Sequence, residues 1–163
     1  MSAKSQQLQI RIAPAQKAAL KRRARRAGLD LSSYVLTRVL PPESERVEAL
    51  VRALRRDDTA RFALAELNTL LAGLTAAQLP DAVADVELTG LSPFLRNYLA
   101  AMVEETAQRL GVSPPPWVHG VEPLDEPYFA APFPRLRPYL LLASPVAFKR
   151  RNLYVDAGTG DRV

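Results

Sequence analysis

The first twelve residues contain a short stretch in which apolar and polar side chains alternate strictly. Residues 7–12 read QLQIRI, with Leu8, Ile10 and Ile12 on one face and Gln7, Gln9 and Arg11 on the other. A period of two is typical of a β-strand that buries one face. The pattern therefore predicts a single strand at this position.

From residue 14 onward the period lengthens to that of a helix. Residues 14–27 predict a basic helix, which Pro14 starts and Gly28 ends as a left-handed cap. Residues 31–39 predict a second helix with Asp30 as its N-cap. The predicted order is strand, helix, turn, helix.

A lone strand needs a partner for its backbone N–H and C=O groups, and no second strand is evident nearby in the sequence. The simplest partner is the same strand of a second copy, in an antiparallel pair, which predicts a homodimer. Such a two-stranded ribbon fits the major groove of double-stranded DNA. There Gln can bond to adenine and Arg to guanine.

The charge distribution favours the same interpretation. Residues 1–40 carry nine Lys or Arg and one acid, a net charge of +8, whereas residues 41–163 carry 13 bases and 16 acids, a net charge of −3. A basic head on a mildly acidic body is typical of a nucleic-acid-binding module. On the basic helix we expect phosphate contacts from Lys21, Arg22 and Arg25.

The alternation QLQIRI, the helix that begins with Pro14, and the sequence GLDLSSYV at residues 28–35 together resemble the ribbon-helix-helix family of DNA-binding proteins, which includes many antitoxins and autorepressors. The resemblance covers residues 6–40. It implies that Gln7, Gln9 and Arg11 read DNA bases, and that Leu31, Ser32 and Ser33 hold a backbone phosphate at the start of the second helix. The plainer alternative is an exposed strand and a solvated basic helix.

The middle of the chain has helical periodicity. Val47, Leu50, Val51 and Leu54 follow the spacing of one helix face, and further helices are predicted at about 60–72, 75–84 and 93–110. The last of these has Ser92 as its cap and Gly111 just beyond its end.

Little in the sequence points to catalysis or to a cofactor. The acidic pairs Asp57-Asp58 and Glu104-Glu105 predict solvated surface, because adjacent helical residues do not face each other. The one histidine, His119, has no evident nucleophile beside it. We therefore expect no enzyme activity, no catalytic residue, no cofactor and no metal site.

The lack of cysteine, of a secretory signal and of a long apolar run predicts a cytoplasmic protein that does not contact a membrane.

Residues 113–163 combine many prolines with seven of the eleven aromatic residues of the chain. Large apolar anchors on a stiff backbone predict a tail that orders by wrapping a surface, either that of its own helical region or that of another protein. For a partner surface the candidates are Trp117, Tyr128, Phe129, Phe133, Phe148, Arg150 and Arg151. A short helix is expected after Ser144-Pro145, and an edge strand at 153–155.

The sequences FALAELNTLLAGL, PPPWVHGVEPLDEPYF and LLLASPVAFKRRNLYVDAGTGDRV, within residues 60–163, resemble a bacterial family of small proteins commonly encoded beside nucleotidyltransferase-like toxins. That resemblance implies that the middle and tail bind and neutralise a toxin while the basic head represses the operon. Arg150 and Arg151 are then candidates for pairing with acidic groups of the toxin.

We therefore predict a mostly α protein in three parts: a ribbon-helix-helix module at 1–42, a helical region at 43–112 and a Pro- and aromatic-rich tail at 113–163. The expected function is that of an antitoxin that binds operator DNA as a dimer and neutralises a protein toxin. The alternatives are a stand-alone repressor whose C-terminal region senses a ligand or adds oligomer contacts, and, less favoured, an enzyme with a shallow helical site.

Overall fold

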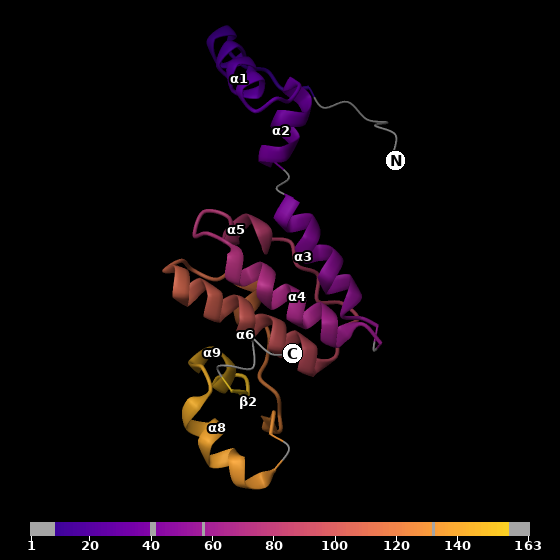
Figure 1. Cartoon of the computed structure of the whole chain (residues 1–163), viewed down its shortest axis with the longest axis vertical. Helices are drawn as coiled ribbons and strands as arrows, with labels where there is room; N and C mark the ends of the chain where they lie inside the picture. The colour runs from indigo at the N-terminus through magenta and orange to yellow at the C-terminus, as the bar shows by residue number, and fades with distance from the viewer. Residues whose placement is uncertain (1–8, 40–41, 57, 132, 157–163) are drawn as a thin grey trace. The chain divides into compact units, whose positions relative to one another are not determined.

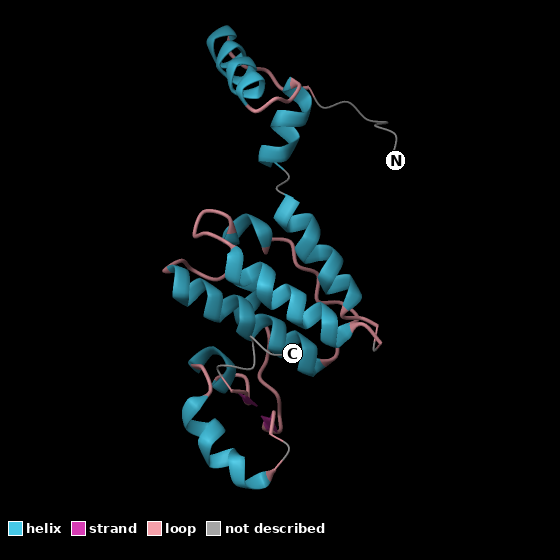
Figure 2. Cartoon of the chain, in the orientation of Figure 1, coloured by secondary structure: helices cyan, strands magenta, loops and turns pink. Residues whose placement is uncertain are grey.

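The computed structural model describes residues 9–39, 42–56, 58–131 and 133–156, and these are mostly helical (Figures 1 and 2). The chain divides into two compact units, Met1–Pro41 and Pro42–Val163. The N-terminal unit contains α1 (Pro14–Arg26) and α2 (Leu31–Val39). The C-terminal unit contains α3 (Pro42–Ala53), α4 (Ala60–Gly73), α5 (Leu79–Ala82), α6 (Pro93–Leu110), α7 (Pro116–His119), β1 (Tyr128–Phe129), the 3-10 helix η1 (Pro134–Leu136), α8 (Arg137–Ala143), α9 (Val146–Lys149) and β2 (Leu153–Tyr154).

Local capping residues account for both ends of α1 and for the start of α2. Pro14 occupies the first turn of α1, where the Gln16 side chain accepts a 2.9 Å hydrogen bond from the Ala13 N–H. The turn after α1 contains Gly28 with φ of 69°, a left-handed conformation that glycine adopts without strain. Asp30 caps α2 by accepting a 3.0 Å hydrogen bond from the Ser33 N–H. These findings confirm both predicted helices.

The strand predicted for residues 7–12 is not evident in the single chain. Residues 9–12 have no regular secondary structure, residues 7 and 8 lie outside the described part, and the first strand of the described chain is β1. A strand is defined by hydrogen bonds to a neighbour, and one copy offers this segment no such neighbour. Pairing with a second copy therefore stays a prediction.

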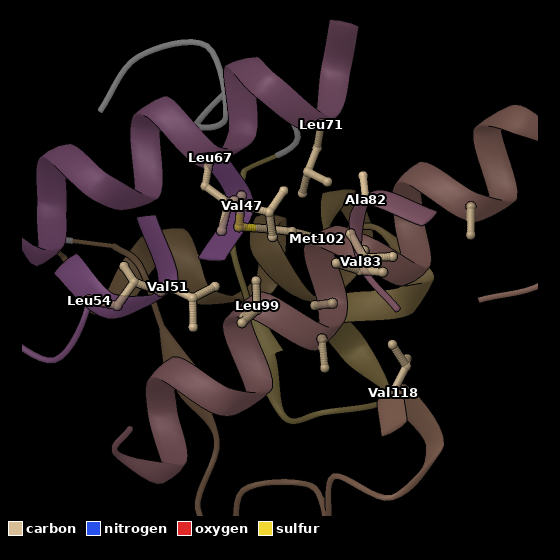
Figure 3. Close-up of a cluster of buried hydrophobic side chains, with 14 of the residues drawn as sticks. Val47, Val51, Leu54, Leu67, Leu71, Ala82, Val83, Leu99, Met102 and Val118 are labelled. Atoms are coloured by element: carbon tan, nitrogen blue, oxygen red, sulfur yellow. The ribbon is translucent and has the colours of Figure 1, made fainter. Parts of the chain in front are cut away.

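The core of the C-terminal unit lies between α3, α4 and α6, and Ala82 of α5 and Val118 of α7 belong to the same buried cluster (Figure 3). The predicted stripe is buried at Val47 and Val51 of α3 and at Leu54, the residue directly after it. It meets Leu67 and Leu71 of α4 and the side chains of α6. These contacts bury large aliphatic groups, which is the main stabilising contribution available to an all-helical unit.

α6 is the central helix, because most of its residues between Asn97 and Ala107 are buried. Its ends match the prediction. The Ser92 hydroxyl accepts a 3.3 Å hydrogen bond from the Leu95 N–H, and Gly111 has φ of 68°. By contrast, the helix predicted for 75–84 is shorter, since α5 spans only four residues.

Residues 113–156 fold onto α6 and form no separate compact unit. Phe148, Leu153 and Val155 belong to the same buried cluster as α3, α4 and α6. β1 and β2 form a two-stranded parallel sheet in which Tyr128 pairs with Leu153 and Phe129 with Tyr154. The division predicted after residue 112 is thus not a boundary between units, because the aromatic tail covers the chain's own helical core.

Candidate functional site

The strongest charge concentration lies on α1. Its 13 residues contain no acid, and all its cationic side chains are exposed: Lys17, Lys21, Arg22, Arg23, Arg25 and Arg26. Ala24 is the buried residue of the helix. The three predicted phosphate contacts, Lys21, Arg22 and Arg25, are thus solvent-accessible cations on one helix, which is the arrangement that attracts a nucleic-acid backbone.

The segment before α1 exposes both its polar and its apolar residues. Gln9 and Arg11 are exposed, as base-reading residues must be, whereas Gln7 lies outside the described residues. Ile10 and Ile12, expected on a buried face, are also exposed, at 62% and 41%. Within residues 9–12, the alternation therefore has no buried face in one chain.

The rest of the N-terminal unit also buries few of its apolar side chains. In residues 9–39 the buried side chains are Ala24 and Tyr34, whereas Leu29, Leu36 and Val39 are exposed together with the two isoleucines. We call these five exposed apolar residues, Ile10, Ile12, Leu29, Leu36 and Val39, the N-terminal apolar set. Two buried side chains are too few to stabilise two helices, since small modules already bury a low fraction of their surface.

The start of α2, predicted to hold a phosphate, is occupied by a carboxylate of the chain itself. Ser33 donates its N–H to Asp30 Oδ1 at 3.0 Å and its hydroxyl to Asp30 Oδ2 at 2.5 Å. Ser32 is exposed and Leu31 is half-buried. Asp30 thus satisfies the donors of Ser33, and a phosphate at this site would have to displace it and overcome its negative charge.

In the tail, three of the predicted partner-binding residues have structural roles inside the C-terminal unit. Trp117 donates its indole N–H to the Val83 carbonyl oxygen at 2.8 Å. Phe148 is buried and packs edge-on against Tyr98 with 5.3 Å between ring centres. Arg151 is 5% exposed. We therefore remove Phe148 and Arg151 from the candidate partner surface, because their side chains are enclosed by the chain's own core.

Arg150 and Arg151 pair with an acid of this chain, Glu104 on α6. Arg151 contacts Glu104 Oε2 at 3.1 Å, and its guanidinium also donates to the carbonyl oxygens of Val118 and Val121. Arg150 contacts Glu104 Oε1 at 3.1 Å but is itself exposed.

The prediction that Glu104 is solvated is wrong, since it is 5% exposed. Asn97, seven residues earlier on the same buried stripe, was the signal in the sequence that polar residues face inward here.

The remaining predicted tail aromatics lie at the surface. Phe129 stacks on Tyr154 at 4.6 Å, and the Arg137 guanidinium lies 5.2 Å from the Phe129 ring centre. Tyr128 packs against Phe94 yet stays 42% exposed, and Phe133 is 53% exposed. Tyr128 and Phe133 are therefore the predicted aromatics that a partner could reach, whereas Phe129 is half-buried.

Burial raises the pKa of the Tyr98 phenol above its ordinary value, and the neighbouring Tyr128 adds a smaller contribution in the same direction. Tyr98 lies between Phe94 and Phe148, so its ionised form would lose solvation without gaining a cation. This tyrosine therefore acts as a packing residue of α6.

A shallow groove of about 490 Å³ lies beside the N-terminal half of α6. Its lining mixes charge and apolar surface, with Arg96, Glu122 and Asp125 next to Leu88 and Leu124. Asn97 fixes one wall by donating to the Glu122 carbonyl oxygen at 2.9 Å.

Among the residues that the structure describes, no three side chains of His, Asp or Glu come together as metal ligands. Within the same residues, no helix is long and apolar enough to cross a membrane.

No family model, no curated protein and no solved structure matches this chain. The resemblances to the ribbon-helix-helix family and to the proteins encoded beside toxins thus receive no support from similar proteins.

Proposed function

We propose that this protein is a dimeric, sequence-specific DNA-binding regulator of the antitoxin type, in which the N-terminal unit binds operator DNA and the C-terminal unit binds and neutralises a protein toxin of the nucleotidyltransferase-like class. The proposal assigns base contacts to Gln7, Gln9 and Arg11 and phosphate contacts to Lys21, Arg22 and Arg25.

One observation supports the DNA-binding half most strongly: the N-terminal unit combines an acid-free cationic helix with five exposed apolar side chains. The cations suit a polyanion. The N-terminal apolar set suits a second copy, because two helices that bury only two side chains within residues 9–39 need another surface to complete their core. A ribbon formed by two copies of residues 7–12 would bury Ile10 and Ile12 and leave Gln9 and Arg11 facing outward.

The geometry at Asp30 modifies one part of this proposal. Because Asp30 already accepts both donors of Ser33, we keep Leu31 and Ser32 as the candidate phosphate contacts at α2 and expect Ser33 to contribute through the cap only. The dimer would then depend for phosphate affinity mainly on the side chains of α1.

The test is selection of duplexes from a randomised DNA library by the full chain, followed by titration of the selected duplex and of a scrambled duplex. The proposal predicts a selected sequence with two-fold symmetry, and binding at least about a thousandfold tighter than to scrambled DNA. Equal affinity for both duplexes would contradict it and leave a non-specific cationic surface.

The groove beside α6 favours a second candidate, a stand-alone repressor that senses a small ligand. The two candidate functions differ in the kind of molecule that makes the protein release its DNA. For the antitoxin, a bound protein partner changes operator affinity, whereas for the sensor a small molecule does so through Arg96, Glu122 or Asp125. Co-purification of the chain with the product of the neighbouring gene would favour the first.

A further inference from the structure

We infer that η1 and α8 form a preformed docking element for a partner protein that carries an apolar groove with an acidic rim. The inference deepens the toxin-binding half of the proposed function and rests on it only for the identity of the partner. Apart from Phe133, the residues of this surface were not among the partner-binding candidates predicted from the sequence, because those candidates were aromatic residues and arginines.

The element exposes an apolar surface that the rest of the chain leaves uncovered. We define the α8 surface as Phe133, Leu136, Tyr139, Leu141, Leu142 and Val146, all of which are exposed. Leu142 is the extreme case, at 83%. Contiguous exposed apolar patches are uncommon on a protein that acts alone, and they mark binding surfaces.

The exposed apolar residues of α8 span a wide face, about 160° of its circumference. Successive residues of an α-helix are rotated by about 100°, so Tyr139 and Leu142 lie about 60° apart, Leu141 lies about 100° beyond Leu142, and Leu140 points to the buried side. In Figure 1, α8 lies on the outer side of the C-terminal unit, and its main neighbours are η1 and β2. A wide apolar face on a helix normally packs against another surface, and an apolar groove in a partner protein receives such a face.

The helix is nevertheless held in place, so it is ready to dock. Ser144, directly after α8, is buried, and its hydroxyl lies within hydrogen-bond distance of the carbonyl oxygens of Leu140 and Val155, at 2.6 and 2.8 Å, so its single proton is shared between them. Leu140 anchors the underside of the helix. A helix fixed in its bound conformation loses little conformational entropy on binding, which favours affinity.

Cations predominate around the α8 surface, and the nearest acids along the chain are Glu126 and Asp156. Residues 127–155 contain five Lys or Arg and no acid. Three of these cations touch the surface or its edge: Arg135 lies over the Phe133 ring at 5.2 Å, Arg137 over Phe129 at 5.2 Å, and Lys149 donates to the Leu142 carbonyl oxygen at 2.9 Å. A complementary partner must therefore present acidic side chains around its groove.

Two other occupants fit the same surface less well. A second copy of the chain would bring cations against cations at the rim, which opposes association. An anionic bilayer also satisfies the charge, but its affinity scales with the apolar area that is buried, and α8 is only seven residues long. Phe133, Tyr139 and the flanking Arg135 and Arg137 belong to residue types that are enriched at protein interfaces.

The experiment uses the full chain in its host cells with the photoreactive amino acid p-benzoylphenylalanine at position 142. A matched control carries it at position 62, because Phe62 on α4 is 79% exposed, nearly as much as Leu142. The inference predicts that irradiation cross-links position 142, and not position 62, to one protein. When purified, that protein should bind the wild-type chain with an affinity that falls as salt rises from about 0.05 to 0.5 M.

In the same titration, Leu142→Asp should weaken binding at least about tenfold, whereas Phe62→Asp should leave it unchanged. Both side chains are exposed, so neither change should alter the thermal midpoint of the chain. Cross-links from position 142 only to copies of this chain, only to lipid, or to nothing would overturn the inference, as would a partner that binds Leu142→Asp as well as wild type. A cross-linked partner that is no nucleotidyltransferase-like protein would leave the docking element standing and overturn the toxin assignment instead.

Discussion

At the scale of single residues, Glu104 shows how burial decides the value of an ion pair. It meets two arginines at the same 3.1 Å distance, but one partner, Arg151, is buried and the other, Arg150, has a side chain that is 65% exposed. Exposed pairs contribute little, because water screens them and side-chain entropy opposes them. Loss of Arg151 would leave the buried Glu104 carboxylate with only the exposed Arg150 as a cationic partner.

Arg151→Ala should therefore lower the free energy of unfolding of the C-terminal unit by about 3–5 kcal/mol. Arg150→Ala, which removes the other partner of the same carboxylate, should cost less than about 1 kcal/mol. Guanidinium unfolding of the full chain, followed by the fluorescence of Trp117, the single tryptophan of the chain, measures both. Equal losses for the two variants would show that the burial argument is wrong.

The raised pKa of Tyr98 predicts a pH effect of defined sign. The folded state holds the phenol proton more tightly than the unfolded chain, so this contribution to stability is complete below the ordinary value of 10.0 and is lost as pH rises above it. Tyr98→Phe keeps the ring and removes the proton. The variant should lose less free energy of unfolding than wild type between about pH 9 and 11, as measured by denaturant titration at each pH. An identical alkaline loss in both proteins would contradict this assignment.

At the scale of elements, helix ends were the features most open to prediction. The bounds of α2 and α6 follow from Asp30, Ser92, Pro93 and Gly111, because capping is local chemistry that a short stretch of sequence contains. The tail was not predictable in this way. Arg151 and Glu104 are 47 residues apart in the sequence, and the paired strands β1 and β2 are more than twenty residues apart. No local sequence pattern therefore predicts either contact.

The two glycines that end α4 and α6 should respond in opposite ways to alanine. Gly111 has φ of 68°, so Gly111→Ala should destabilise the C-terminal unit by about 1–2 kcal/mol through backbone strain alone, as nothing lies near the added methyl group. Gly73 has a negative φ and equally open space, so Gly73→Ala should stabilise the unit by about 0.4–1 kcal/mol. Thermal unfolding of the full chain measures both. A gain for Gly111→Ala would disprove the left-handed end of α6.

At the scale of the whole molecule, the proposed division of labour assigns DNA to the N-terminal unit and the protein partner to the C-terminal unit. The sequence predicted the basic character of the first and the helical content of both. It could not show that α8 is left uncovered, since exposure depends on which surfaces the rest of the fold reaches. Nor could it show that Phe148 and Arg151 are enclosed.

Base and phosphate contacts of the N-terminal unit should be separable by mutation. Arg11→Ala should weaken binding to the selected duplex by about 1–3 kcal/mol and spare scrambled DNA. Lys21→Ala should weaken both duplexes alike and reduce the slope of log affinity against log salt by about one. Fluorescence anisotropy titrations over a range of salt concentrations measure both effects. Equal losses of Arg11→Ala on the two duplexes would reassign Arg11 to the phosphate backbone.

The central claim is that two copies pair through residues 7–12, and the absence of natural cysteine permits a direct measurement of it. Single cysteines placed in turn at positions 7 to 12 of the full chain are oxidised, and the rate of disulfide-linked dimer formation is compared with that of a cysteine at the exposed position 62. Opposed residues of an antiparallel pair lie about 4.5–5.5 Å apart between Cα atoms, within reach of a disulfide. We predict rapid cross-linking at one or two central positions and slow cross-linking at the rest. A flat profile, no faster than the control anywhere along the segment, would contradict the paired ribbon and with it the proposed mode of DNA binding.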